Sequence, residues 1–408
     1  MIQMLDFKIF DGPSIYSHKP VAKILLKMEE YIDTPSTEIE GLYDYLVSYF
    51  PGLSSHYCSK GYEGGFLERL SEGTYLAHII EHLCLEIQNC LGYQVRYGKT
   101  RRAKEDCYDI VFAYENKQVV KACTYFIIDY VKSFLNKQYF DFENGMAFIN
   151  EAKNREVQTL NDLISIPIIA VTGTSGKTTT IKIISDILSN SGYKVGIATT
   201  QGIYKNNICI KEGNATGYAS AKKVINDSTI QIAILETSGN SILQEGLAYT
   251  KADVAVFTNL AANDLGIKDI DAMTDLLHIK SLVVEAVKND GVSVLNGDDP
   301  YASDFMERAK GRIILYSLNR NTPIINNHMN RGGEIIWCEN GSIYAIKEGI
   351  KRIIIDVADI PATLNDSPIC NSYNAMAAIS ACYALGISLD TIADYFFQNE
   401  DTISTSRV

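Results

Sequence analysis

The stretch Ile166–Ile184, IPIIAVTGTSGKTTTIKII, decides the fold of this 408-residue chain. Its first residues form an apolar run typical of a buried strand, and its last residues have the apolar spacing of a helix. The usual phosphate-binding loop between such elements is G-x-x-x-x-G-K-[ST]. Here the first glycine is Gly173, two positions late, and Val171 stands in its usual place. This sequence fits either a degraded nucleotide-binding site or an intact phosphate-binding loop of a different form.

The loop between the strand and the helix has the residue types that bind phosphate. Glycines let backbone N–H groups turn toward an anion, and the start of the helix adds its dipole. Lys177 would reach the outer phosphates, and the hydroxyl of Thr178 suits Mg²⁺. The predicted phosphate-binding residues are Gly173, Thr174, Ser175, Gly176, Lys177, Thr178 and Thr179. The alternative is a plain turn with a capping threonine and a surface lysine, which the strand–loop–helix order disfavours.

The chain around this loop predicts two α/β domains. From Ile164 onward apolar strands alternate with helices, which indicates a doubly wound, mostly parallel sheet. We expect this P-loop domain to span 164–408. Residues 1–140 read as a separate mixed α/β domain, and 141–163 as the connection between the two.

The composition limits the partners of the chain. Its formal net charge of -12 argues against a nucleic-acid partner. The apolar runs are too short to span a membrane, and the first residues do not resemble a signal peptide. Nine scattered cysteines without any C-x-x-C pair indicate reduced thiols. We therefore predict a cytoplasmic protein without nucleic-acid or membrane partners.

The loop VTGTSGKTTT resembles the GT-x-GK-T-[ST] loop of the Mur ligases, in which the late glycine is the normal form. Further motifs follow in the order and spacing of that family: AILETSGNSILQEGL, VAVFTNLAANDLG, LLHIKSLVVEAV, VLNGDDP and NSYNAMAAISACYALG. From Ile164 onward the chain is similar to the Mur-like half of cyanophycin synthetases. The resemblance implies a ligase that uses ATP and Mg²⁺ to activate a carboxylate as an acyl phosphate. The amine of an amino acid would then attack it, with an amino acid, peptide or polymer as substrate.

The resemblance also implies roles for single residues. Glu236 ends the apolar strand QIAILE and would hold Mg²⁺; its alternative role is a capping or solvated carboxylate. Chemistry alone predicts that Lys280, a lone lysine on a helix, is solvated. In the family the matching lysine is carbamylated and bridges metal ions, so the expected catalytic residues are Lys177, Glu236 and Lys280.

Three asparagines match the nucleotide side of the family's site. Asn296 begins an N-x-D-D turn, and Asn371 and Asn374 lie in the motif NSYNAMAAI. Asparagine is also common in turns for structural reasons. Both interpretations stay open for these positions.

The chain departs from the family pattern in several places. Asp264 stands where the family has a histidine that binds a second metal, although a carboxylate can still ligate Mg²⁺. Gly239 stands where typical cyanophycin synthetases have an arginine. There is no room for an ATP-grasp domain between about Phe140 and Ile164, and we expect the chain to lack the family's C-terminal lid domain. We expect a homo-oligomer or a partner subunit to complete the site; the alternative is a nucleotide-binding pseudo-enzyme or accessory subunit.

The first domain contains HIIEH, an H-x-x-E-H motif typical of zinc sites on a helix. His78 and His82 are one turn apart, and we expect them on a polar face opposite the apolar stripe of the helix. They would hold Zn²⁺ with a further carboxylate, Glu86 or Glu68, and Glu81 would act as general base. The alternative is a solvated polar face. About 130 residues here resemble the N-terminal domain of cyanophycin synthetases, which implies a metallohydrolase as a third candidate function.

Overall fold

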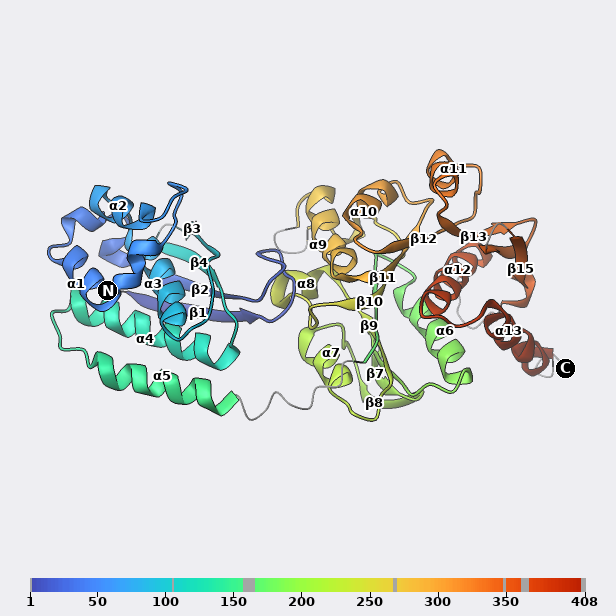
Figure 1. The fold of residues 1–408 in the computed structure, drawn as a ribbon. Helices are drawn as coiled ribbons and strands as arrows, with labels where there is room; N and C mark the ends of the chain where they lie inside the picture. The colour runs from blue at the N-terminus through green and yellow to red at the C-terminus, as the bar shows by residue number, and fades with distance from the viewer. Residues whose placement is uncertain are drawn as a thin grey trace. The chain divides into compact units, whose positions relative to one another are not determined.

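A computed structural model describes residues 2–104, 106–156, 166–266, 270–347, 350–360 and 367–404. The chain divides into two compact units (Figure 1). Unit 1 contains Met1–Gly12 and Tyr16–Leu163, and unit 2 contains Pro13–Ile15 and Ile164–Val408. None of the described helices is long and apolar enough to cross a membrane.

Unit 1 is a small antiparallel sheet covered by helices. Its strands are β1 (Gln3–Phe10), β2 (Val21–Lys27), β3 (Gly98–Lys104) and β4 (Cys107–Ala113), and its α-helices are α1 (Leu42–Tyr49), α2 (Gly65–Glu72), α3 (Leu76–Cys90), α4 (Lys117–Leu135) and α5 (Phe142–Glu156). The strand order is β1-β2-β4-β3. Helix α3 packs on β3 and β4, α4 packs on α3, and α5 packs on α4. The core is therefore built in successive layers outward from the sheet.

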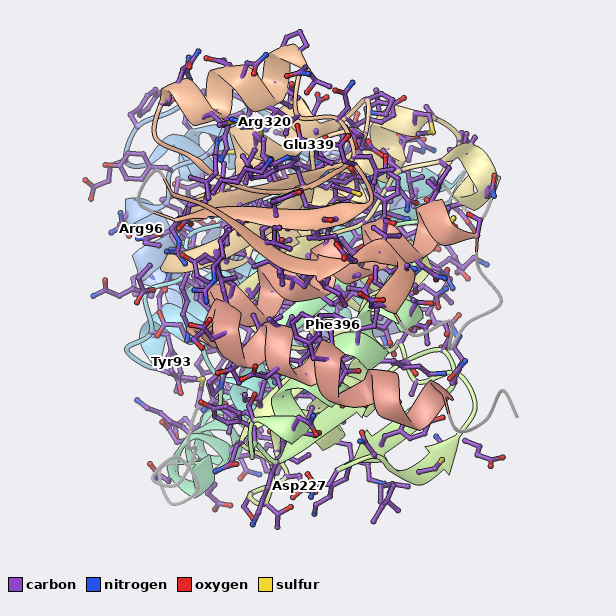
Figure 2. All side chains as sticks on the ribbon, turned by 90° about the vertical axis from the view of Figure 1, so that its right-hand side faces the viewer. Tyr93, Arg96, Asp227, Arg320, Glu339 and Phe396 are labelled. Atoms are coloured by element: carbon purple, nitrogen blue, oxygen red, sulfur yellow. The ribbon has the colours of Figure 1, made fainter. Side chains whose placement is uncertain are left out.

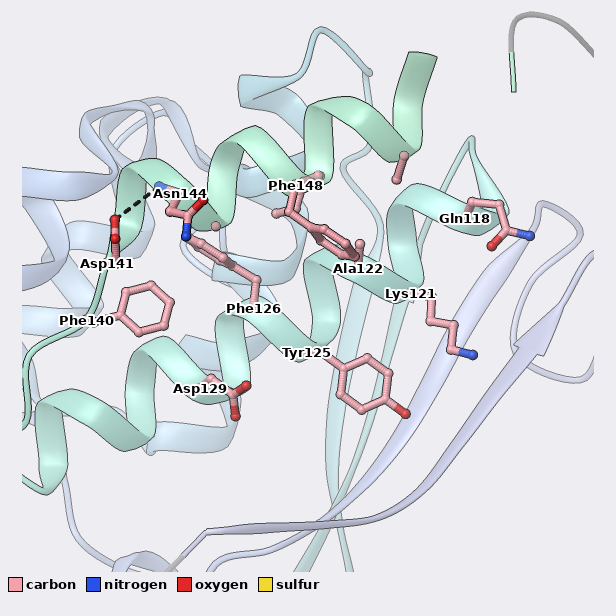
Figure 3. A pocket seen from close by; sticks show the side chains of 13 residues that line it. Gln118, Lys121, Ala122, Tyr125, Phe126, Asp129, Phe140, Asp141, Asn144 and Phe148 are labelled. Atoms are coloured by element: carbon pink, nitrogen blue, oxygen red, sulfur yellow. Dashed lines mark hydrogen bonds between the residues drawn. The ribbon is translucent and has the colours of Figure 1, made fainter. Parts of the chain in front are cut away.

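Helix α5 occupies most of the stretch 141–163 that was expected to be a connection. Its Phe142 joins an aromatic cluster with Phe50 and Tyr130, which anchors it to the core of unit 1. A Cβ at Gly145 would lie 2.3 Å from the ring of Phe126, so the two helices approach closely at this point. Beside this contact, α4 and α5 line a groove of about 1190 Å³, whose side chains Figure 3 shows.

Unit 2 is built on an eleven-stranded sheet in the described part of the chain, in the order β15-β14-β13-β12-β11-β10-β5-β9-β6-β7-β8. Its strands are β5 (Ile168–Thr172), β6 (Val195–Ala198), β7 (Gly202–Lys205), β8 (Ile208–Glu212), β9 (Ile232–Glu236), β10 (Ala252–Phe257), β11 (Val287–Asn296), β12 (Arg312–Ser317), β13 (Glu334–Glu339), β14 (Ser342–Lys347) and β15 (Ile350–Asp356). The pairs from β13 to β6 are parallel, and antiparallel strands extend both edges. The predicted fold class, a doubly wound and mostly parallel sheet, is confirmed.

Helices cover both faces of this sheet (Figure 1). They are α6 (Lys177–Asn190), α7 (Tyr218–Ile225), α8 (Gly239–Glu245), α9 (Met273–Glu285), α10 (Ala302–Arg308), α11 (Pro323–Asn330), α12 (Pro368–Ala384) and α13 (Leu389–Ser404). Ile169 of β5 shares a core with α6 and α12, whereas Ala170 shares the opposite core with α9. Figure 2 shows Phe396 on α13, and its buried ring belongs to the first of these cores.

The sheet order makes the carboxyl end of β5 the candidate position for a ligand site. All five residues of β5 are buried, as expected for a central parallel strand covered on both faces. Its neighbours β10 and β9 both come later in the chain and lie on opposite sides of it. Loops that leave such a switch point diverge to the two faces, and the crevice between them is where open α/β sheets bind ligands.

Candidate functional site

The loop between β5 and α6 can only be formed by glycine at two positions. Gly173 has φ of 145° and Gly176 has φ of 80°, conformations that residues with a Cβ rarely adopt. A Cβ at Gly173 would lie 2.0 Å from Thr258 Oγ1, and one at Gly176 would lie 2.4 Å from Asn374 Oδ1. The late glycine is therefore required by the shape of a closely packed loop.

The loop is held in shape by the segment after β10. The backbone N–H of Thr174 donates to the carbonyl of Asn259 at 2.9 Å, and that of Ser175 donates to Asn259 Oδ1 at 3.0 Å. Thr258 Oγ1 donates to the carbonyl of Ser175 at 2.7 Å. The first N–H groups of α6 have no acceptor within their own helix, and they carry the positive end of its dipole. This arrangement is suited to an anion such as a phosphate.

Glu236 lies beside the start of α6, at the carboxyl end of β9. Its side chain is 1% exposed. Glu236 Oε2 accepts hydrogen bonds from Thr178 Oγ1 at 2.9 Å and from the backbone N–H of Thr200 at 3.1 Å, and Lys177 Nζ is 3.9 Å from Oε1. A carboxylate and a hydroxyl in contact are hard oxygen donors that fit Mg²⁺. The sequence identified Glu236 and Thr178 but missed Thr200, which orients the carboxylate.

Lys280 is buried, so the prediction from chemistry alone that this lysine is solvated is wrong. It lies on α9, which packs on β5, β10 and β11, and the exposed fraction of the residue is 0%. Its Nζ donates to Asp264 Oδ2 at 2.5 Å and to Thr174 Oγ1 at 3.3 Å. Burial lowers the pKa of Lys280 to about 8, and the neighbouring Asp264 opposes this shift. The ion pair connects α9 to the phosphate-binding loop.

The three predicted asparagines have different surroundings. Asn296 donates from Nδ2 to the carbonyl of Thr258 at 2.8 Å and accepts from the N–H of Asp298 at 3.0 Å, so it shapes the turn. Asn374 is 5% exposed, and its Nδ2 has no hydrogen-bond partner among the residues that the structure describes. Asn371 precedes Asn374 by nearly one turn of α12. A buried amide without a partner, next to the loop at Gly176, is a group that a ligand would satisfy.

The two aspartates of the N-x-D-D motif support this site through contacts that the sequence did not indicate. Asp299 accepts from the N–H groups of Leu260 at 2.8 Å and Tyr301 at 2.9 Å, and burial raises its pKa. Asp298 accepts from Tyr373 Oη at 3.0 Å. The pair of aspartates therefore fixes the loops after β10 and β11. The motif N-x-D-D gave their positions but not these partners.

Comparison with protein families matches both parts of the chain. Residues 23–136 match the cyanophycin synthase-like N-terminal domain, and residues 171–382, half of the chain, match the Mur ligase middle domain. The chain belongs to the Mur ligase family. This confirms the resemblance on which the site residues were predicted.

Individual relatives of this Mur ligase family member include a synthetase and a ligase by name. Cyanophycin synthetase of Synechocystis sp. is 37% identical over 228 residues, which cover 56% of this chain and 26% of that protein. The UDP-N-acetylmuramoyl-L-alanyl-D-glutamate–2,6-diaminopimelate ligase of Clostridium botulinum is 29% identical over 235 residues, 56% of this chain and 44% of that protein. The chain thus matches about a quarter of the length of the cyanophycin synthetase.

Comparison with solved structures gives partial matches at low sequence identity. A UDP-N-acetylmuramoyl-L-alanyl-D-glutamate–2,6-diaminopimelate ligase covers 61% of this chain and 49% of its own, with 21% identity and a TM-score of 0.46. The FolC protein of E. coli, in complex with DHPP and ADP, covers 57% of this chain with 17% identity and a TM-score of 0.38.

In unit 1, the H-x-x-E-H motif does lie on a helix, α3, but the predicted polar face is wrong. Glu81, His82 and Glu86 are each 5% exposed. The physical reason is that α3 is covered on several sides: by β3 and β4, by α4, and by the 3-10 helix η3 (Pro51–Ser55). The motif therefore lies inside the part of this Mur ligase family member that matches the cyanophycin synthase-like domain.

The donors that gather around the motif differ from the predicted set. Cys58 Sγ lies 3.4 Å from His78 Nε2, and metal-ligating atoms of Cys58, His78 and His82 all lie within 4.8 Å of one another. Glu86 is instead bonded to His56 at 2.8 Å, and Glu68 is bonded to Lys60. The third donor is thus a thiol from a loop about 20 residues earlier, which no spacing in the motif could indicate.

The titratable groups of the motif are shifted by burial. Burial, with a smaller contribution from Arg69, lowers the pKa of His78 to about 4. Burial and the neighbouring histidines lower the pKa of His82 to about 2. Both imidazoles are therefore neutral, the form that ligates metals. Burial raises the pKa of Glu81 to about 7, although Thr100 Oγ1 donates to it at 2.5 Å. These side chains line a cavity of about 470 Å³.

Proposed function

We propose that unit 2 is an ATP-dependent amide ligase that activates a carboxylate as an acyl phosphate for attack by the amine of an amino acid. The observation that carries this proposal is the contact of Glu236 with Thr178 and Lys177 at the start of α6. The unpartnered Nδ2 of Asn374 beside Gly176 supports a ligand at the same place. Family membership supports the assignment of this chain to the ligases. The names of the relatives give the substrates of those relatives and not the substrates of this chain.

In this proposal each residue binds or positions. The first N–H groups of α6 and the ammonium of Lys177 would hold the outer phosphates. Thr178 and Glu236 would hold Mg²⁺, which supplies positive charge against the phosphates. A carboxylate oxygen of the substrate attacks the γ-phosphorus and ADP leaves; the amine then attacks the acyl carbon and phosphate leaves. Catalysis would come from positioning and from charge neutralisation.

The test is product analysis with ATP, Mg²⁺, aspartyl-arginine peptides and a panel of amino acids. We expect one ADP for each amide bond, and a product mass equal to that of the two substrates minus water. Lys177→Ala should abolish both, whereas Lys182→Ala should change neither, because Lys182 is exposed on the same helix. Phosphate release that persists unchanged in Lys177→Ala would overturn the proposal. ATP binding without turnover under any amine would favour the pseudo-enzyme or accessory subunit instead.

A second candidate function is metal-dependent amide hydrolysis by unit 1, which the cluster of Cys58, His78 and His82 favours. One thiolate and two imidazoles are a donor set for Zn²⁺ with an open position for water. Thr74 Oγ1 lies 2.9 Å from His78 Nδ1, which leaves Nε2 for the metal. Glu81 would act as general base. The full chain should contain zinc by elemental analysis and hydrolyse peptides, and Glu81→Gln should lose hydrolysis but keep zinc; chelator-insensitive hydrolysis would exclude this role.

The other partners remain predictions. A cytoplasmic location, and a second copy or partner subunit that completes the ligase site, are both consistent with the sequence. Light scattering of the purified chain, with and without ATP, would measure its oligomeric state. A strictly monomeric chain with full turnover would contradict the need for a second subunit.

A further inference from the structure

The hydrogen bonds around Lys280 determine which chemical form of its nitrogen fits. Lys280 Nζ donates to Asp264 Oδ2 at 2.5 Å and to Thr174 Oγ1 at 3.3 Å. Thr174 Oγ1 also accepts from the N–H of Ala261 at 3.0 Å and lies 3.3 Å from Asp264 Oδ2. Since this hydroxyl accepts from Lys280 and Ala261, its own proton is left for Asp264 Oδ2 at 3.3 Å or for the carbonyl of Ala261 at 3.4 Å. The network is complete when Nζ supplies two protons.

An ammonium meets this requirement and a carbamate does not. An ammonium has three N–H donors and a positive charge that Asp264 balances. A carbamylated nitrogen has one N–H and carries a negatively charged carboxylate group. It could not donate to both Asp264 and Thr174, and its charge would lie against that of Asp264. A neutral side chain in place of Asp264 would remove this repulsion.

Each of the two lysines near the phosphate-binding loop lies close to a carboxylate. Lys177 Nζ lies 3.9 Å from Glu236, and Lys280 lies against Asp264. The side chain of Lys280 is 1% exposed and that of Asp264 is 33% exposed. A buried ammonium needs such a counter-ion, because removing one partner leaves an uncompensated charge. The aspartate therefore matches the unmodified lysine.

We infer that Lys280 remains an unmodified ammonium, that Asp264 is its fixed counter-ion, and that this ion pair replaces a second metal ion in the ATP site. The divalent cation would then be held at Glu236 and Thr178 alone. Lys280 is in this view a positioning residue, because it acts on the phosphate-binding loop through Thr174. The metal count rests on the proposed ATP-binding function, whereas the chemical form of Lys280 does not.

The first experiment tests the chemical form without nucleotide. The full chain is equilibrated with ¹³C-bicarbonate and examined by ¹³C NMR, beside Lys280→Arg, which cannot form a carbamate, and Asp264→His. We expect no carbamate signal in the wild type and a new one in Asp264→His. A wild-type carbamate signal that Lys280→Arg lacks would overturn the inference.

The second experiment counts metal ions with Mn²⁺ and a non-hydrolysable ATP analogue, by electron paramagnetic resonance. We expect one tightly bound Mn²⁺ per analogue in the wild type and in Lys280→Arg, because arginine keeps the cation. Two tightly bound ions in the wild type would overturn the inference. If the analogue does not bind at all, the ligase proposal fails, and the ¹³C result still decides the form of Lys280.

Discussion

The two candidate sites of this chain differ in how their residues are brought together. In unit 2 the phosphate-binding loop, Glu236 and Asp264 lie at or after the carboxyl ends of β5, β9 and β10, three neighbouring parallel strands, and helices α9 and α12 add Lys280 and Asn374. In unit 1 the donors come from one helix and from a loop that precedes it by about 20 residues. A parallel sheet collects successive loops at one edge, so a motif at one strand end predicts the others. When a site is formed by a helix and a distant loop, a motif on the helix does not predict which loop residue completes the site.

The largest expected effect separates the two sites. Lys177→Ala should reduce ATP-dependent amide formation by about 100- to 1000-fold, because it removes the cation that we propose holds the outer phosphates. Zinc content and peptide hydrolysis should stay unchanged, since unit 1 contains its own donors. Steady-state ADP release and elemental analysis of the same preparation check both. A parallel loss of zinc would indicate general misfolding.

The titration of Lys280 should be visible in stability. Burial lowers the pKa of Lys280 from 10.5 to about 8. At a pH between these two values, Lys280 is therefore protonated in the unfolded chain and deprotonated in the folded chain. The free energy of unfolding should therefore rise with pH from about 8 to 10.5, by roughly 3 kcal/mol from this group. Urea unfolding of the wild type and of Lys280→Met at several pH values isolates the effect as a difference. Parallel pH dependences of the two proteins would contradict it.

A substitution in unit 1 should impair zinc binding and leave the ATP site of unit 2 unchanged. Cys58→Ser should weaken zinc binding by roughly 10- to 100-fold, because a hydroxyl is a poorer zinc ligand than a thiolate. ATP binding by unit 2 should not change. Competition with a coloured chelator measures the zinc affinity. Cys209→Ser is the matched control, since Cys209 is exposed in unit 2, and an equal loss in both variants would contradict the assignment.

The short loop can be tested by a pair of glycine variants. Gly176→Ala should destabilise the chain by roughly 1–3 kcal/mol, because φ is 80° and the new Cβ would meet Asn374. Gly192→Ala has a similar φ of 87° and nothing within 4 Å of the new Cβ. Its cost should be no more than about 1 kcal/mol, from φ alone. Equal midpoints in urea unfolding would show that the contact with Asn374 contributes nothing.

The smallest effect concerns the unpartnered amide. Asn374→Leu should leave the stability of the free chain unchanged or raise it by about 1 kcal/mol, because it removes a buried Nδ2 without a partner and loses only the long hydrogen bond, 3.5 Å, that Oδ1 accepts from Thr180. ATP affinity should fall by about 10-fold if the amide binds the nucleotide. Calorimetry with ATP measures this loss. An unchanged affinity would favour a purely structural role for Asn374.

The sequence predicted the fold of unit 2 and the strand-end residues because apolar strands, glycines and polar strand ends all obey the same topology. It placed Glu236 and Thr178 correctly beside the loop. The family resemblance named Lys280 as a site residue, but the residue pattern alone could not, because the spacing of α9 does not reveal that a lysine on it is buried against Asp264. In unit 1 it found His78 but not Cys58, since that contact depends on how a loop folds over the helix.

The most direct test of the central claim follows an oxygen atom. The full chain is incubated with ATP, Mg²⁺, an amino acid and an aspartyl-arginine peptide whose carboxylates carry ¹⁸O, and the released phosphate is analysed by mass spectrometry. Activation through an acyl phosphate transfers one carboxylate oxygen, so we expect one ¹⁸O in each phosphate released with amide product. Phosphate that carries no ¹⁸O, released at the same rate, would show that ATP is hydrolysed by water and would contradict the account.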